Sequence, residues 1–382
     1  MGSEVSAVQK IKSGILAVSF FSLTCLAAVA QGKRSPAAVA PRTAWSFAVS
    51  GDSRNCGNVV MPAIAAGAKK DQAAFYWHLG DLRAIYGPDE DYKAEPEHRG
   101  QPVSMDSYLK DAWPDFIQSQ IAPFDPLPFF IGIGNHETKA PKTRQEFVTQ
   151  FAKWLDSSVL RKQRLADNPK GTAPRTYYHW IQGSVDFIYV DNATTDQFEA
   201  AQMSWFQEVL RQAQANPRVQ SLVVGMHEAL PDSLSAKHSM NDSAKGTASG
   251  RQVYEDLLNF RRKSHKNVYV LASHSHFYMN GIYDSDYWRA HGGVLPGWIV
   301  GTAGAARYAL PADAGRAKEA KQKVYGYLLG LVQPGGTIDF KFQEVTRQDV
   351  PEAVNQRFTP ELVDYCFNKN TAYKEEAPGA SK

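Results

Sequence analysis

The chain has 382 residues, of which 43% are hydrophobic and 21% are charged, a composition typical of a globular protein with a large buried core. The length allows one large domain or two of ordinary size. The formal net charge of +3 is small and the basic residues are scattered, so no nucleic-acid partner is expected.

The N-terminus has the features of a signal peptide, which we place at residues 1–30. Lys10 and Lys12 precede an apolar segment at 14–30, and a small-x-small motif predicts cleavage before Gln31. The mature protein is therefore expected to be exported, periplasmic or secreted, with no stable membrane association. An uncleaved anchor is the alternative, because about 17 apolar residues are barely enough to span a bilayer.

The rest of the chain divides into three predicted parts. Residues 31–43, rich in Pro and Ala, are expected to form a linker, 44–348 a folded domain, and 349–382 a C-terminal extension. Short apolar runs bounded by turn residues predict strands at 45–50, 73–79, 128–133, 177–181, 185–190, 219–226, 267–272, 298–300, 325–332 and 337–344. Apolar residues at three- and four-residue spacing predict helices at 59–70, 108–120, 144–155, 200–215 and 251–262.

The order of these elements predicts an α/β fold. Strands alternate with helices in the first half, and two late hairpins add antiparallel strands, which together give a mixed β-sheet sandwich flanked by helices. Residues 85–107 and 230–250 are polar insertions without a period. We expect them to be loops that face a substrate, with simple surface excursions as the alternative.

Five short polar segments each follow a predicted strand, and they carry the chemistry. They lie at 51–54, 80–81, 134–137, 226–227 and 273–276. Because ligands bind beyond the carboxyl ends of strands in an α/β sheet, the side chains after these strands should converge. The residues in question are Asp52, Asp81, Asn135, His227 and His274. Asp and His together suit zinc, iron or manganese, and a pair of such ions can hydrolyse a phosphate ester.

The order of these segments resembles that of the calcineurin-like metallophosphoesterases, a group that includes purple acid phosphatases, over residues 44–346. The resemblance makes 44–348 the catalytic domain, with two divalent or trivalent metal ions, zinc, iron or manganese, and a bridging hydroxide that attacks phosphorus. It implies that Asp81 bridges the metals, that Asp52 and His276 hold metal one, and that Asn135, His227 and His274 hold metal two. His136 would serve the leaving group as general acid or transition-state stabiliser.

Two positions depart from the family pattern. Many members have His where this chain has Arg54, and purple acid phosphatases have Tyr where this chain has Ala84. Arg54 cannot ligate a cation, but its guanidinium could hold a phosphate oxygen and act in catalysis, with a salt bridge to a nearby carboxylate as the alternative. His238, in the second polar insertion, is a candidate to bind the phosphate, and an exposed loop histidine is the alternative.

Two cysteines, Cys56 and Cys366, remain once the predicted leader with Cys25 is removed. An even count in an exported chain predicts a disulfide between them, and two free buried thiols are the alternative.

The expected function is metal-dependent hydrolysis of a small-molecule phosphate ester, with phosphomonoesters favoured. A phosphodiesterase or nucleotidase on the same site is the first alternative. A binding protein with a degenerate metal site is the second, motivated by Arg54. A membrane-tethered lipid phosphodiesterase would follow if the leader were not cut.

Overall fold

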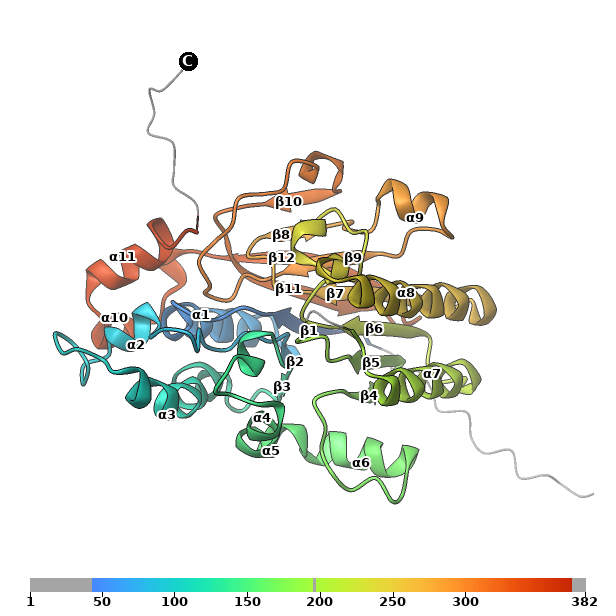
Figure 1. Ribbon diagram of the computed structural model, residues 1–382, viewed down its shortest axis with the longest axis horizontal. Coiled ribbons are helices and arrows are strands. Elements are labelled where there is room, and N and C mark those ends of the chain that lie inside the picture. Colours follow the sequence, from blue (N-terminus) through green and yellow to red (C-terminus); the bar gives the residue numbers. More distant parts are fainter. Residues whose placement is uncertain (1–42, 195–196, 373–382) are drawn as a thin grey trace, which may run out of the picture. The chain divides into compact units, whose positions relative to one another are not determined.

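The computed structural model describes residues 43–194 and 197–372. Its two β-sheets pack face to face and helices cover their outer surfaces (Figure 1). The predicted α/β fold, a mixed β-sheet sandwich flanked by helices, is confirmed. The predicted signal peptide and the predicted linker up to residue 42 lie outside the described residues.

The first sheet has five strands, of which three neighbours run parallel. In sheet order they are β12 (Ile338–Val345), β11 (Tyr325–Val332), β1 (Trp45–Ser50), β2 (Ala73–His78) and β3 (Phe129–Ile131). Strands β1, β2 and β3 are parallel, whereas β11 and β12 add an antiparallel hairpin beside β1. The parallel strands therefore end at a common edge.

The second sheet has seven strands with a parallel centre. In sheet order they are β10 (Glu319–Lys321), β8 (Tyr278–Asn280), β9 (Gly297–Val300), β7 (Asn267–Ala272), β6 (Ser221–Gly225), β5 (Val185–Tyr189) and β4 (Tyr178–Gln182). Strands β5, β6, β7 and β9 are parallel, and antiparallel strands flank them on both sides.

Most helices occupy the connections between strands, and the last two follow β12. They are α1 (Gly57–Lys70), α2 (Glu90–Lys93), α3 (Met105–Phe116), α4 (Arg144–Gln150), α5 (Ala152–Leu155), α6 (Ser158–Asp167), α7 (Ala200–Ala215), α8 (Ala244–Ser264), α9 (Asp286–Ala290), α10 (Glu352–Arg357) and α11 (Pro360–Asn368). Helices α7 and α8 pack their apolar residues onto the second sheet (Figure 1).

Aromatic side chains fill the space between the two sheets. Phe187 of the second sheet contacts Phe47 and Phe75 of the first sheet, with ring centroids 5.0 and 5.1 Å apart. Trp180 stacks on Phe130 with a centroid distance of 3.9 Å. Large buried rings contribute much of the apolar surface removed from water, so this layer helps to hold the two sheets together.

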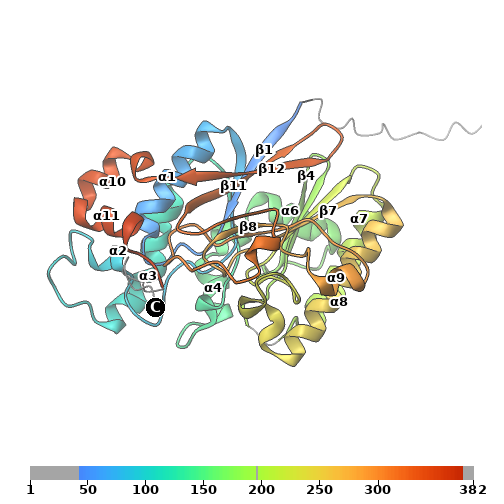
Figure 2. The same ribbon diagram turned by 90° about the horizontal axis from the view of Figure 1, so that it is seen from above.

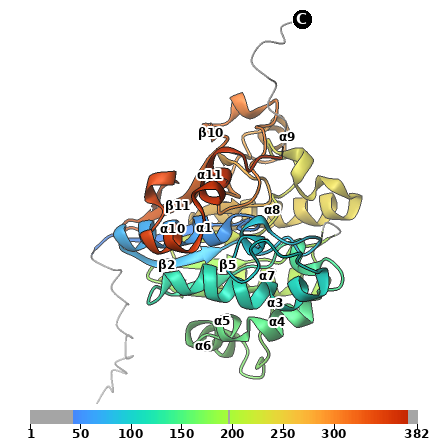
Figure 3. The same cartoon turned by 90° about the vertical axis from the view of Figure 1, so that its left-hand side faces the viewer.

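The C-terminal residues belong to the same core as the first sheet. Val354, Phe358 and Val363 are buried in the core cluster that also contains the strands of that sheet. A disulfide joins Cys366 of α11 to Cys56, the residue before α1. Helices α10 and α11 lie beside α1 when the molecule is seen from above (Figure 2) or from its left side (Figure 3).

Several elements differ from the sequence-based predictions. Helix α8 begins at Ala244 rather than 251, because Ser243 caps it and its first turns carry polar and small residues that show no apolar period. Strands β8 and β10 have three residues each and were not predicted. Within the described residues, no helix is both long and apolar enough to cross a membrane.

Candidate metal centre

Loops from both sheets meet where the strands β1, β2, β3, β6 and β7 end. The backbone N–H of Asp52, after β1, donates to the carbonyl of Gly80, after β2, at 2.9 Å. The N–H of Ser273, after β7, donates to the carbonyl of His227, after β6, also at 2.9 Å. The five polar segments predicted from the sequence therefore lie at one edge of the sandwich, as parallel strands require.

Strained backbone aims three of these side chains inward. Asp52, Asp81 and His274 have φ angles of 62°, 60° and 64°, in the left-handed region that side-chain-bearing residues seldom adopt. Gly80 has a φ of 100°, and a Cβ there would lie 2.5 Å from the backbone nitrogen of Gly134. Such strain tends to gather at functional sites, where the surrounding structure holds it in place.

Asp81, His227 and His274 form a group with the spacing of metal ligands. One potential ligand atom from each lies within 4.8 Å of the others. The Nε2 of His227 lies 3.3 Å from Asp81 Oδ1, 3.1 Å from His274 Nδ1 and 2.9 Å from Asn135 Oδ1. The structure thus brings together the four residues that the sequence assigned to metal two.

The tautomer of His227 determines which of its ring nitrogens can bind a metal ion. Its Nδ1 lies 3.1 Å from the carbonyl oxygen of Leu79, which only accepts, so Nδ1 carries the proton. The lone pair on Nε2 then points at the oxygens of Asn135 and Asp81. Two nitrogens and two oxygens that converge in this way suit zinc, iron or manganese.

A second cluster surrounds Arg54. Its Nη2 lies 3.0 Å from His276 Nε2, its Nη1 contacts His136 Nε2, and its Nε lies 3.8 Å from Asp81 Oδ2. Asp52 Oδ1 lies 3.2 Å from His276 Nε2. The predicted metal-one ligands are therefore adjacent, with the Arg54 guanidinium beside them.

The two carboxylates in the site are fully buried. Burial raises the pKa of Asp52 to about 6, against the opposing effect of His227 and Arg54. Burial also acts to raise the pKa of Asp81, but His136, His227 and Arg54 outweigh it and hold that pKa below its ordinary value. Within the described residues, Asp52 Oδ1 and Asp81 Oδ2 make no hydrogen bond, and buried carboxylate oxygens of this kind are good ligands for a cation.

Burial lowers the pKa of His274, with a further lowering from His227, and the pKa of His276, with a further lowering from Arg54. Both imidazoles are therefore neutral, which is the form that binds metal ions. The His276 Nδ1 donates to the Ala306 carbonyl at 2.6 Å, so the lone pair of His276 is on Nε2.

Some residues that shape the site were not among the predicted ligands. Glu137 accepts hydrogen bonds from the backbone N–H groups of Asp81, Leu82 and Gly134, at 2.8 to 2.9 Å. Asn192 accepts from the N–H of His227 at 3.1 Å. Glu137 stands in the same polar segment as Asn135 and His136, but nothing in the sequence around Asn192 marks it.

Aromatic residues line the mouth of the site. Tyr308 stacks on His276 with centroids 4.0 Å apart, and the ring of His238 lies 5.2 Å from Tyr308 and 5.8 Å from His274. The ring of Tyr86, which is 65% exposed, lies 5.1 Å from that of His136. His238 is exposed, and it thus lies on the solvent side of the predicted ligand His274.

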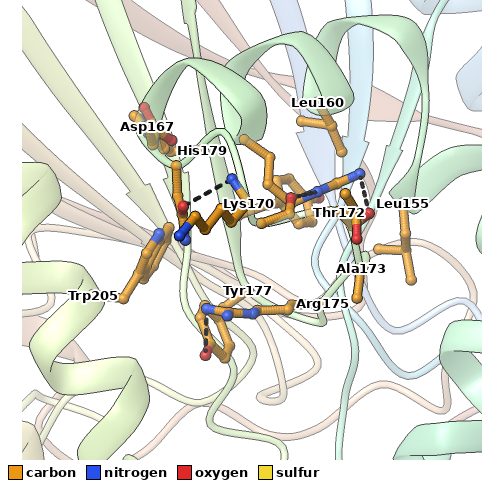
Figure 4. A pocket seen from close by; sticks show the side chains of 14 residues that line it. Leu155, Leu160, Asp167, Lys170, Thr172, Ala173, Arg175, Tyr177, His179 and Trp205 are labelled. Atoms are coloured by element: carbon orange, nitrogen blue, oxygen red, sulfur yellow. Dashed lines mark hydrogen bonds and ion pairs between the residues drawn. The ribbon is translucent and has the colours of Figure 1, made fainter.

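A cavity of about 300 Å³ lies elsewhere, between α6, β4 and α7. Figure 4 shows its lining, with Trp205 and Tyr177 on one side and Lys170 and Arg175 nearby. The predicted ligands do not line it. The cavity is therefore separate from the metal centre.

The fold was compared with known proteins. No protein-family model and no curated protein sequence matches the chain. Among solved structures, it is similar to the purple acid phosphatase PPD1 of yellow lupin (Lupinus luteus) seeds, with a TM-score of 0.53 and 13% identity over 79% of this chain. It is also similar to PhoD, with a TM-score of 0.52 and 17% identity over 81% of this chain.

The similarity spans 52% of the lupin chain, about half of its length, and 73% of the PhoD chain. At this level of identity the comparison establishes the fold. The structure gathers the five polar segments at one edge of the sandwich. The chain therefore shares its fold with these two proteins, in agreement with the fold that its resemblance to the calcineurin-like metallophosphoesterases predicts.

Proposed function

We propose that the protein is an exported, metal-dependent phosphoesterase that hydrolyses small phosphate esters, with monoesters favoured. The observation that carries the proposal is the convergence of four side chains: potential ligand atoms of Asp81, His227 and His274 lie within 4.8 Å of one another, and Asn135 Oδ1 lies 2.9 Å from His227 Nε2. Carboxylate, amide and imidazole from four separate loops form a set that a purely structural role does not require.

These four residues would hold a metal ion that polarises a phosphoryl oxygen and lowers the pKa of water. Arg54 would bind the phosphate, because a guanidinium donates two parallel hydrogen bonds to phosphate oxygens. The Arg54 side chain is 10% exposed, so a phosphate must enter the site to meet it.

His136 is placed to serve the leaving oxygen. Its Nδ1 donates to the Ala84 carbonyl at 2.5 Å, which directs Nε2 into the site. In the proposed step water adds to phosphorus, the ester P–O bond breaks, and the lone pair of His136 Nε2 takes a proton from the water and passes it to the departing oxygen. The products are inorganic phosphate and an alcohol, and a positioned acid of this kind contributes about 10²- to 10⁴-fold to the rate.

The depth of the site supports monoesters as substrates. Asp52, Asp81 and His276 are at most 2% exposed, so a phosphate at the end of a molecule reaches them more easily than one in the middle of a chain. A diesterase or nucleotidase is the alternative on the same residues. Export is supported by the Cys56–Cys366 disulfide, because such bonds persist in oxidising compartments.

The direct test measures hydrolysis of p-nitrophenyl phosphate and bis-p-nitrophenyl phosphate by the purified protein. We expect faster turnover of the monoester, loss of turnover with a chelator, and recovery when zinc, iron or manganese is returned. Asp81→Ala should abolish both metal binding and turnover. The control Asp286→Ala, on the exposed face of α9, should leave both unchanged.

Turnover that survives complete metal removal would contradict the proposal.

A second candidate, a binding protein on the same fold, is favoured by the Arg54 guanidinium beside the predicted ligands. This second candidate predicts that the metal-loaded protein binds inorganic phosphate but turns over neither ester.

N-terminal sequencing of the exported protein tests the predicted start at Gln31.

A further inference from the structure

We propose that Arg54 stands in for a metal ion, so that the protein binds one ion and clamps the phosphate between that ion and a fixed guanidinium. This inference rests on the proposed phosphoesterase function. It specifies the positive charges of the site, because the guanidinium of Arg54 takes the place of one of the two metal ions expected from the sequence.

The lone pairs of two histidines are directed at Arg54. The Nδ1 atoms of His276 and His136 donate to the carbonyls of Ala306 and Ala84, at 2.6 and 2.5 Å. Each ring therefore has its lone pair on Nε2, and both Nε2 atoms accept from Arg54. A lone pair that accepts a guanidinium N–H is not free to bind a metal ion.

The positive charge of Arg54 disfavours a metal ion beside it. Arg54 lies beside buried Asp81, with its Nε 3.8 Å from Oδ2, and its Nη2 bonds His276, which in turn contacts Asp52. Asp52 already accepts from the backbone N–H of His274 at 2.7 Å. A metal ion among Asp52, Asp81 and His276 would lie against the guanidinium, and like charges at such short range repel strongly in a buried site.

The other side of Asp81 differs from the side that faces Arg54. The potential ligand atoms of Asp81, His227 and His274 lie within 4.8 Å of one another. The Arg54 contacts described above involve His136, His276 and Asp81 Oδ2, whereas His227 faces Asp81 Oδ1 and His274 contacts His227. One cation position therefore remains, and Asp81 lies between it and Arg54.

The guanidinium also retains capacity to bind a substrate. Arg54 Nε is buried and makes no hydrogen bond within the described residues, while Nη1 lies 3.5 Å from the hydroxyl of exposed Tyr86. Five N–H donors cannot all be used by two imidazoles. The remaining donors could form the paired hydrogen bonds by which Arg recognises phosphate.

The test counts metal ions per chain in the purified protein by mass spectrometry after loading with zinc or manganese and removal of excess. We expect about one ion per chain for the native protein, because one complete ligand set is present. Arg54→His removes the charge and adds an imidazole ligand, so about two ions should bind. Arg54→Lys is the matched control, which keeps the charge and should keep about one ion.

A second measurement follows inorganic phosphate binding by calorimetry on the metal-loaded proteins. Arg54→Lys should weaken phosphate binding by about 10-fold or more while the metal count stays the same, because Lys lacks the paired donors. Unchanged phosphate affinity in Arg54→Lys would overturn the substrate role of Arg54. This readout also applies if Arg54→His does not fold.

The outcomes separate this inference from the proposed function. About two ions bound to the native protein, or a folded Arg54→His variant that still binds about one, would overturn the replacement of a metal by Arg54 and leave the phosphoesterase proposal standing. A native protein that binds no metal at all would overturn the phosphoesterase proposal itself.

Discussion

At the level of single residues, Glu137 holds two ligand-bearing loops together with one carboxylate. Its Oε2 accepts from the N–H groups of Asp81 and Gly134, and its Oε1 accepts from that of Leu82. The side chain is fully buried. Because Glu137 bonds the loops after both β2 and β3, it fixes the orientation of Asp81.

Glu137→Gln should weaken the metal centre although it is nearly isosteric. The new NH₂ group would face at least one of the three backbone donors, which leaves a buried N–H without an acceptor and costs about 1–3 kcal/mol of unfolding free energy. We expect metal affinity to fall by about 10- to 100-fold, as for other residues that orient ligands. Calorimetric metal titration and urea unfolding measure the two effects.

The matched control is Glu255→Gln on the exposed side of α8, which should change neither quantity. If Glu137→Gln bound metal as tightly as the native protein, the carboxylate would not be the group that positions Asp81.

At the level of elements, a buried histidine joins three segments far from the metal centre. His179 of β4 bonds Asp186 of β5 through Nδ1 and Asp167 of α6 through Nε2, both at 2.8 Å. Burial would lower the pKa of His179, but the two carboxylates outweigh it and raise that pKa to about 10. A charged imidazole therefore ties α6 to the β4–β5 hairpin.

This raised pKa makes stability depend on pH. Since the pKa is about 6.5 in the unfolded chain, the stabilisation is complete below pH 6.5 and is lost as pH rises towards 10. We expect the native protein to lose on the order of 2 kcal/mol more than His179→Gln across this window. Urea unfolding at several pH values gives both curves.

His291→Gln, at the exposed end of α9, is the control and should follow the native curve. Parallel curves for the native protein and His179→Gln would show that His179 is not charged in the folded state.

At the level of the whole molecule, one covalent bond joins the two ends of the folded chain. The Cys56–Cys366 disulfide spans a sequence separation of 310 residues. It connects α11 to the start of α1, and the N–H of Cys56 bonds the Arg54 carbonyl at 3.0 Å. The C-terminal residues thus help to hold the segment that carries Asp52 and Arg54.

Replacing both cysteines by Ala should lower the unfolding free energy by about 2–4 kcal/mol, because a long loop is no longer closed in the unfolded chain. Urea unfolding with and without a reductant measures the loss. The reductant should shift the native curve towards that of the double variant and leave the double variant unchanged. Thiol titration shows whether the disulfide of the native protein has been reduced. It therefore distinguishes a disulfide that resists reduction from one whose reduction leaves the stability unchanged.

Much of the fold could be predicted because the relevant signals are local. The apolar runs at β1, β7 and β11 and the periodic helix α7 have the bounds expected from the sequence. Unlike β3, the three-residue strands β8 and β10 lie outside any longer apolar run, so only pairing with a neighbour defines them.

The sequence by itself determined the identity and order of the polar residues at strand ends, and hence the class of chemistry, because residue type and strand pattern are written along the chain. Only the tertiary structure decided how these residues divide around Asp81. Asp52 and His274, 222 residues apart, share a hydrogen bond of 2.7 Å, and Arg54 occupies the lone pairs of His136 and His276. The direction of a lone pair depends on the carbonyl behind each ring, and packing between distant segments sets that partner.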